Sequence, residues 1–143
     1  MATVGQICVR TVVSTTREAT IAAAARLMRD NHVGSLVITE RRGDTQRPVG
    51  IITDRDIVVR AVADEGNDLD LLRAKDVCSD HVVALDADAE VREAIQLMTD
   101  KAIRRIPVVD HDMPVGIVTI GDLAAQRDPK SALGQISSAA PNN

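Results

Sequence analysis

Gly-Ile-Ile-Thr-Asp-Arg-Asp-Ile at residues 50–57 and Gly-Ile-Val-Thr-Ile-Gly-Asp-Leu at residues 116–123 are two versions of one phrase. Each version begins with a glycine and an apolar strand end, and each continues with Thr-x-x-Asp. After the two phrases no glycine or proline occurs before Gly66 and Pro129 respectively, which favours a helix in both places. The phrase therefore predicts two strand-to-helix junctions, and the other segments can be placed relative to them.

The segments that precede the two phrases also repeat. A strand predicted at 82–85 opens the second repeat. A helix predicted at 19–30 matches one at 88–100, and a strand predicted at 33–39 matches one at 103–110. The offset between matching positions is 70 residues, and it falls to 66 after the polar hairpin loop at 40–47, which is four residues longer than its counterpart. Surface loops tolerate such insertions, so the change of offset supports the repeat.

Each repeat has the order β-α-β-β-α, which predicts an α/β fold. We expect domains at residues 1–68 and 69–128, followed by a loosely ordered tail at 129–143 that is rich in Ser, Ala and Asn. Units of this size have too little core to be stable alone, so their sheets should pack against each other about a pseudo-twofold axis. That packing would place both junctions beside clefts, where small-molecule sites tend to form.

The composition excludes several classes of protein. Of the 143 residues, 45% are hydrophobic and none is aromatic, so an aliphatic core is expected and base-stacking platforms are absent. The net charge of −4 and the pI near 5.3 argue against nucleic acid as a partner. No apolar run approaches the ~20 residues that cross a bilayer. We expect a cytoplasmic protein that does not contact membranes.

The chain's cysteines and histidines indicate neither catalysis nor metal binding. Cys8 and Cys78 occupy equivalent positions in the repeat, either as a redox switch or as two small buried hydrophobic residues. His32, His81 and His111 are scattered among turns without carboxylates at ligand spacing. No nucleophile has a recognisable base, and no glycine-rich phosphate loop is present. We predict no enzyme activity, no catalytic residue and no metal site.

The Thr-x-x-Asp elements have two explanations. In the first, Thr53 and Thr119 cap helices, and the carboxylates of Asp56 and Asp122 stabilise the positive helix ends without any ligand. In the second, each carboxylate accepts hydrogen bonds from the two hydroxyls of a ribose, and the helix N–H groups lie near an anionic part of the ligand. The motif alone leaves both explanations open.

Taken in order, these pieces resemble a tandem pair of CBS domains, a family named after cystathionine beta-synthase. The resemblance rests on both phrases, on Ala-x-x-Leu-Met at 24–28 and 94–98, and on Ile-Arg-Arg-Ile-Pro-Val-Val-Asp at 103–110. It covers residues 7–128, and the order of the pieces, occurring twice, is its most specific feature. The first phrase resembles that of bacterial members that consist of little besides the pair.

The resemblance implies a regulatory module that senses a ligand. Family members commonly bind AMP, ATP or a related adenosyl compound in their clefts, and the pairs often form homodimers. The implied mechanism is a shift between conformations or assembly states, which an unknown effector protein would read. No cofactor is required by this interpretation. The alternative is a protein-interaction scaffold without a ligand, in which the Thr-x-x-Asp elements only cap helices.

The family's ligand-binding positions can be carried over to this sequence. The aspartates of the two phrases would hold ribose hydroxyls with the threonines beside them, the isoleucines after the glycines would line an adenine slot, and an arginine before the proline of 103–110 would contact phosphate. The residues are Asp56, Thr53 and Ile51 in the first half, and Asp122, Thr119, Ile117 and Arg104 in the second, with Arg105 beside Arg104.

The two halves differ at the arginines. At the offset of 70, Gly34 and Ser35 stand where the second half has Arg104 and Arg105. A guanidinium suits phosphate oxygens and a glycine offers only its backbone. We therefore predict that the Asp122 cleft binds a phosphorylated ligand better than the Asp56 cleft. Two arginines of the first half, Arg55 and Arg60, offer partial compensation, although arginines early in a helix are usually solvated.

Overall fold

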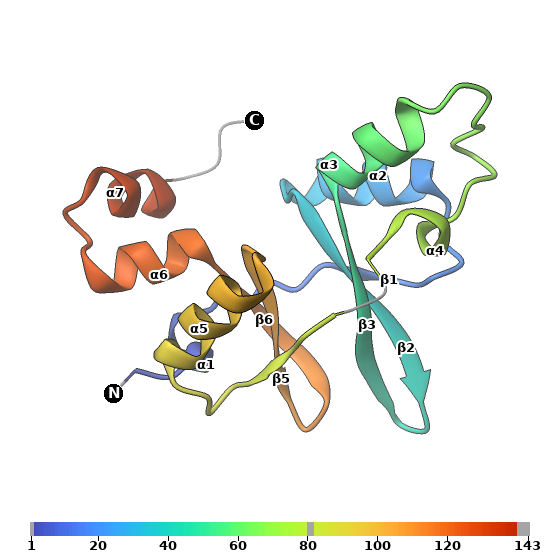
Figure 1. Ribbon diagram of the computed structural model, residues 1–143. Helices are drawn as coiled ribbons and strands as arrows, with labels where there is room; N and C mark the ends of the chain where they lie inside the picture. Colours follow the sequence, from blue (N-terminus) through green and yellow to red (C-terminus); the bar gives the residue numbers. More distant parts are fainter. Residues whose placement is uncertain (1, 80–81, 140–143) are drawn as a thin grey trace. The chain divides into compact units, whose positions relative to one another are not determined.

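The computed structural model describes residues 2–79 and 82–139, and it forms two compact units (Figure 1). We call residues 13–82 the first unit, and residues 1–12 together with 83–143 the second unit. Each unit contains helices and one three-stranded sheet, and its main elements follow one another along the chain in the order β-α-β-β-α. The predicted α/β class and the predicted repeat are therefore confirmed, while the packing of the two sheets about a twofold axis stays a prediction.

The first unit is built on a sheet of order β1-β2-β3, with β1 parallel to β2 and β2 antiparallel to β3. Strands β2 and β3 are joined at Gly43 and Asp44, as the predicted hairpin required. The elements are β1 (Ser14–Thr15), α2 (Ile21–Asn31), β2 (Ser35–Arg42), β3 (Thr45–Thr53), α3 (Asp54–Asp56), the π-helix η1 (Ile57–Val62) and α4 (Ala74–Val77).

Helix α2 shows how the sequence determines this unit. The Thr20 hydroxyl caps the helix by accepting a hydrogen bond from the Ala23 N–H at 3.1 Å. Ile21, Ala24 and Met28 follow at helical spacing and are buried. Together with apolar residues of β2, β3, η1 and α4 they form one core, which includes Leu36, Ile38, Ile52, Ile57, Ala61, Ala74, Val77 and Cys78.

The second unit repeats the design with a sheet of order β4-β5-β6. Its β5–β6 ladder has an irregularity after Val108, and the β2–β3 ladder has the equivalent one after Ile38. The elements are α1 (Val4–Ile7), β4 (Leu85–Asp86), α5 (Val91–Lys101), β5 (Arg105–Asp110), β6 (Met113–Thr119), α6 (Ile120–Arg127) and α7 (Ala132–Ser138). The core contains Val4, Cys8, Ala94, Ile106, Val108, Val118 and Leu123.

Each of two short helices belongs to a different unit from the one that its position in the chain suggests. Helix α1 lies at the start of the chain but joins the second unit, where the Val4 N–H donates to the Ala89 carbonyl at 2.8 Å. Helix α4 lies at the start of the second repeat but joins the first unit, where the Ala74 N–H donates to the Ala19 carbonyl at 2.8 Å. The domain boundary predicted between residues 68 and 69 stays a prediction.

Two local features differ from the sequence-based expectations. The strand expected at 82–85 is the two-residue β4 at Leu85–Asp86. In the segment 129–143, α7 packs on α6, and the loose order expected of this tail stays a prediction. The helix after Thr53 becomes a π-helix, whose wider turn is seen in the hydrogen bond from the Ala63 N–H to the Val58 carbonyl at 3.0 Å. Within residues 2–79 and 82–139, no helix is long and apolar enough to span a membrane.

Candidate functional site

The junction between β6 and α6 holds Asp122 in a fixed position. Thr119 is the N-cap of α6, and its hydroxyl accepts a hydrogen bond from the Asp122 N–H at 3.3 Å. In return, the Asp122 Oδ2 atom accepts from the Thr119 N–H at 2.8 Å and from the Thr119 hydroxyl at 3.0 Å. This reciprocal arrangement is a capping box.

The junction between β3 and α3 has the same geometry. The Asp56 Oδ2 atom accepts from the Thr53 N–H at 2.9 Å, and the Thr53 hydroxyl accepts from the Asp56 N–H at 3.1 Å. Both aspartates are half-buried. In each carboxylate the other oxygen, Oδ1, accepts no hydrogen bond from the described part of the chain. A capped helix start thus leaves one oriented carboxylate oxygen per unit for an external donor.

The β5–β6 and β2–β3 hairpins place Arg104 and its counterpart Gly34 beside these helix starts. The Arg104 carbonyl accepts a hydrogen bond from the Ile120 N–H at 3.1 Å, and the Gly34 carbonyl accepts from the Asp54 N–H at 3.0 Å. Arg105 lies opposite Thr119 in the β5–β6 ladder. The structure therefore gathers Arg104, Arg105, Thr119 and Asp122 at one end of one hairpin. It also places Gly34 where the first unit lacks an arginine.

In each unit an additional chain segment pairs with the last strand of the hairpin, beside the isoleucine that was predicted to line an adenine slot. Val9 and Ile117 form an antiparallel bridge and exchange both backbone hydrogen bonds, each 3.0 Å long. In the first unit Ser79 pairs with Ile51, and the Ser79 N–H donates to the Ile51 carbonyl at 3.1 Å. These segments directly follow α1 and α4. Because α1 joins the second unit and α4 joins the first, each unit receives one pairing segment beside its strand-to-helix junction.

The glycine that opens each phrase makes this crossing sterically feasible. A Cβ at Gly116 would lie 2.7 Å from the Val9 carbonyl oxygen, and a Cβ at Gly50 would lie 2.7 Å from the Ser79 carbonyl oxygen. Real Cβ atoms do not approach backbone oxygens so closely, because their van der Waals shells would overlap. The glycines are therefore needed for backbone approach, and neither has a positive φ.

Val9 and Ser79 are site residues that the sequence did not point to. Side chains of directly paired residues share one face of a sheet, so Val9 lies beside Ile117 and Ser79 lies beside Ile51. Val9 is 51% exposed despite being apolar. The equivalence of Cys8 and Cys78 was the available signal, because it marks the start of both crossing segments.

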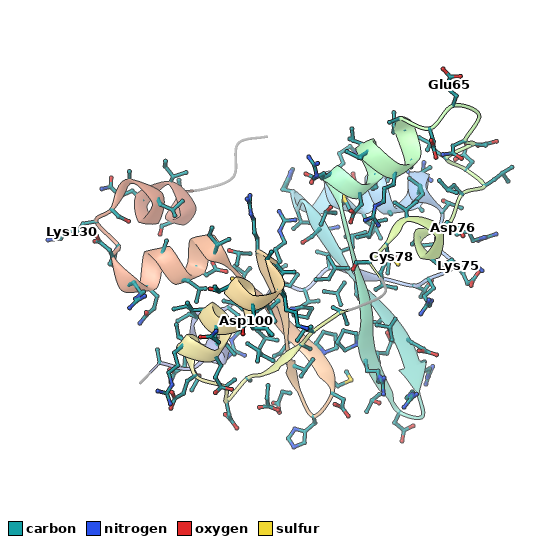
Figure 2. All side chains as sticks on the ribbon, in the orientation of Figure 1. Glu65, Lys75, Asp76, Cys78, Asp100 and Lys130 are labelled. Atoms are coloured by element: carbon teal, nitrogen blue, oxygen red, sulfur yellow. The ribbon has the colours of Figure 1, made fainter. Side chains whose placement is uncertain are left out.

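Both cysteines are buried (Figure 2 labels Cys78, at the end of α4). Burial raises the pKa of the Cys8 thiol; Arg10 lowers the same pKa and Asp122 raises it further. The cysteines thus have the burial expected of small hydrophobic residues, and the redox switch stays untested.

The other polar candidates have local roles. Arg60 donates to the Val77 carbonyl at 3.0 Å, so this guanidinium is held by the first unit's own backbone. Arg55 is exposed near the start of α3. Within the described residues, no three His, Cys, Asp or Glu side chains gather as a metal site would require. The prediction for His81 lies outside the described residues.

Two open grooves of about 220 and 250 Å³ lie on the second unit, along α5 and α6. The larger is lined by apolar residues such as Met98 and Leu123. Neither groove includes Asp122, Thr119 or Arg104. Polar side chains also line both grooves, and Arg127 is common to the two.

Comparison with known proteins gives relatives with this architecture. MK0525 of Methanopyrus kandleri is 39% identical over 121 residues, covering 84% of this chain but only 60% of its own length. Hypoxic response protein 1 of Mycobacterium tuberculosis is 38% identical over 105 residues, covering 73% of this chain and 71% of its own. The crystal structure of Hypoxic Response Protein I, with two coordinated zinc ions, has a TM-score of 0.73 at 35% identity and covers 88% of this chain and 99% of that one.

Two further solved structures are similar. The CBS domain pair of MJ0100, in complex with 5′-methylthioadenosine and S-adenosylmethionine, has a TM-score of 0.77 at 25% identity, covering 92% of this chain and 99% of that one. A hexameric CBS-CP12 protein from bloom-forming cyanobacteria has a TM-score of 0.77 at 26% identity, covering 90% and 73%. The CBS domain family model matches residues 4–62 and 74–127, each match beginning at one of the two short helices. This chain therefore belongs to the CBS domain family and carries two CBS domains in tandem.

Proposed function

We propose that the chain is a regulatory module that binds an adenine nucleotide or a related adenosyl compound. The observation that carries the proposal is the oriented carboxylate in each unit, with Oδ2 held by its own threonine and Oδ1 left for an external donor. The diol of a ribose supplies two such donors. The MJ0100 pair, of the same family and fold, binds two adenosyl compounds.

The second unit is proposed as the preferred site for a phosphorylated ligand. Arg104 and Arg105 occupy the end of the hairpin that carries Asp122, whereas the first unit has Gly34 and Ser35 there. A guanidinium can donate two parallel hydrogen bonds to a phosphate, so its presence at one site alone makes the two sites unequal. Ile117 and Val9 would provide an apolar wall for the adenine.

Signalling is proposed to occur through assembly. Helix η1 exposes three valines, Val58, Val59 and Val62, at 58%, 51% and 58%. Neighbouring apolar side chains on one exposed helix are typical of a protein contact, and the related CBS-CP12 protein is hexameric. We propose a homodimer whose association or conformation changes with the ligand and is read by an effector protein. No catalytic step is part of this proposal.

The deciding experiment is calorimetric titration of AMP, ATP, NAD and S-adenosylmethionine into the protein and into Asp122→Ala and Asp56→Ala. Calorimetry is suitable because the chain has no Trp or Tyr to report binding by fluorescence. We expect saturable binding of a phosphorylated ligand that Asp122→Ala abolishes and Asp56→Ala largely preserves. The reverse pattern would contradict the assignment to the second unit.

The competing candidate is a scaffold that binds no ligand. It is favoured by one observation, namely that each aspartate is already half of a capping box and so has a structural role. Flat titrations with all four compounds, from a folded protein, would favour the scaffold. The search for a function would then turn to the partner protein.

A further inference from the structure

The two grooves along α5 and α6 adjoin each other and differ in character. Ile120 and Met98 line the larger groove, and Arg92 lines the smaller one. Arg127 lines both, and no Asp or Glu is among the described residues that line either. Arg92 already pairs with Glu90 at 2.7 Å, whereas Arg127 forms no ion pair with a residue that the structure describes. The second unit therefore offers a partly apolar groove in which one guanidinium is available to an external carboxylate.

Helix η1 of the first unit has the opposite shape and charge. Its three exposed valines lie at positions i, i+1 and i+4 and so project from one side of the helix. An exposed carboxylate precedes the valines at Asp54, and two more follow them at Asp64 and Glu65, of which Figure 2 labels Glu65. Residues 54–65 contain four acidic and two basic residues, so this projecting surface carries net negative charge.

From these two surfaces we infer that the groove along α5 and α6 of one copy receives the η1 valines of a second copy. In a twofold dimer this contact occurs twice, because each copy supplies one row of valines and one groove. The inference rests on the proposed function, since it takes self-association through η1 from it. It deepens that proposal by naming the surface that the valines meet, and it does not depend on which ligand binds.

Contact of each surface with its own counterpart is disfavoured by charge and by packing. Two η1 helices in contact would bring carboxylates against carboxylates in either direction, because both ends of the valine row carry them. Two grooves facing each other would enclose space that neither copy fills, so their lining atoms would lose dispersion contacts. Valines in the groove avoid both penalties. In either direction of the helix, one exposed carboxylate, Asp54 or Glu65, can approach Arg127.

Complementation between two variants tests which surfaces meet. Val59→Asp places a carboxylate among the valines, and Ile120→Asp places one in the larger groove, where Ile120 is 44% exposed. We expect each variant alone to be a monomer in light scattering coupled to gel filtration. An equimolar mixture still contains one intact groove and one intact row of valines. With one variant isotope-labelled, native mass spectrometry should show mixed dimers at about tenfold the dimer content of either variant alone.

The matched control is Leu133→Asp. Leu133 is 49% exposed on α7 of the same unit and lines neither groove, so this variant should keep the wild-type mass. Dimers formed by either variant alone, or a mixture without mixed dimers, would overturn the inference while the proposed homodimer stands. If both variants keep the wild-type mass, the groove is left to a partner of another sequence, and the inference is wrong. A monomeric wild-type chain would remove the proposed homodimer and the inference with it.

A second measurement uses the wild-type chain and so does not depend on the variants folding. Salt weakens a contact between Arg127 and a carboxylate, whereas it strengthens a contact between two helices flanked by carboxylates. We expect sedimentation equilibrium to give a several-fold larger dimer dissociation constant at about 1 M NaCl than at about 0.1 M. Arg127→Gln should remove most of this dependence, and Arg42→Gln, at an exposed position of β2, should preserve it. A dissociation constant that falls with salt would overturn the inference.

Discussion

Cys8 lies so close to Gly116 that a Cβ at position 116 would stand 2.5 Å from the cysteine sulfur. The same Cβ would be 2.7 Å from the Val9 carbonyl oxygen, so the crossing segment would have to move. We expect Gly116→Ala to lower the free energy of unfolding by about 1–3 kcal/mol, the range for overpacked sites. Urea unfolding followed by far-UV circular dichroism would measure it.

The control for this prediction is a double-variant cycle with Cys8→Ala. Removing the sulfur relieves part of the overlap but leaves the Val9 carbonyl in place. Gly116→Ala should therefore cost less in the Cys8→Ala background than in the wild type. Strict additivity of the two changes would show that the sulfur is not the group that resists a side chain at position 116.

The threonine caps should stabilise both units by similar amounts. Thr53 and Thr119 each accept a hydrogen bond from the N–H of the aspartate three residues on. Thr53→Ala and Thr119→Ala should each lower the free energy of unfolding by about 1 kcal/mol. Thr99→Ala, at an exposed position inside α5, is the control and should change it by less than about 0.5 kcal/mol. Unchanged melting of both cap variants would refute the capping role.

The repeat made much of the fold predictable, because two imperfect copies of one pattern constrain each other. The Thr-x-x-Asp phrases fixed the helix starts, and the offset of 70 correctly matched Gly34 with Arg104, whose carbonyls accept equivalent hydrogen bonds. The exchange of α1 and α4 was not predictable. Four-residue helices leave almost no periodic signal, and which unit they join depends on tertiary contacts.

Within the candidate site, residues that act through side-chain chemistry were the easier ones to find. Asp122 and Arg104 could be selected from the sequence because their side chains are charged. Val9 could not, because it joins the candidate site only through its pairing with β6. The π-helix after Asp56 also escaped prediction, because the sequence Ile-Val-Val-Arg-Ala-Val has the same apolar pattern in an α-helix. Arg60 of this helix donates to the Val77 carbonyl of α4, a tertiary contact that the local pattern does not encode.

The ionisation of Cys8 should report on its charged neighbours. Burial first, and then Asp122, raise the pKa of this thiol, while Arg10 lowers it. In a Cys78→Ser background, the pH dependence of the iodoacetamide reaction should give a Cys8 pKa above the ordinary value of about 8.5. Asp122→Asn should lower that pKa and Arg10→Gln should raise it. Shifts in the opposite directions would mean that these groups lie elsewhere.

The raised pKa of the Cys8 thiol has a consequence for the free energy of unfolding. Because the folded state keeps the Cys8 proton to a higher pH than the unfolded chain, the stabilisation is fully present below the unfolded pKa. It is lost as the pH rises through the folded pKa. Cys8→Ala should therefore flatten the alkaline decline of the unfolding free energy, while Cys78→Ser leaves the part due to Cys8 in place.

Self-association should depend on the valines of η1. Val59 is 51% exposed, and a carboxylate at that position would have to lose its hydration in any apolar contact. We expect Val59→Asp to shift the protein to a smaller species in light scattering coupled to gel filtration. Leu71→Asp is the control, since Leu71 is 72% exposed outside the valine group and should not change the mass. An unchanged mass for Val59→Asp would place the contact on another surface.

The left-handed residue after α5 should limit the stability of the second unit. Ala102 has φ 52° and its N–H donates to the Met98 carbonyl as the helix ends, a conformation that glycine adopts without steric cost. Ala102→Gly should raise the free energy of unfolding by about 0.5–1 kcal/mol, because relief of about 1–2 kcal/mol of strain exceeds the added entropy of the unfolded glycine. The control, Ala25→Gly at an exposed interior position of α2, should lower the same free energy by about 1 kcal/mol. Opposite signs for one substitution at two positions would show that backbone conformation decides the effect; a loss at both would mean that Ala102 is not strained.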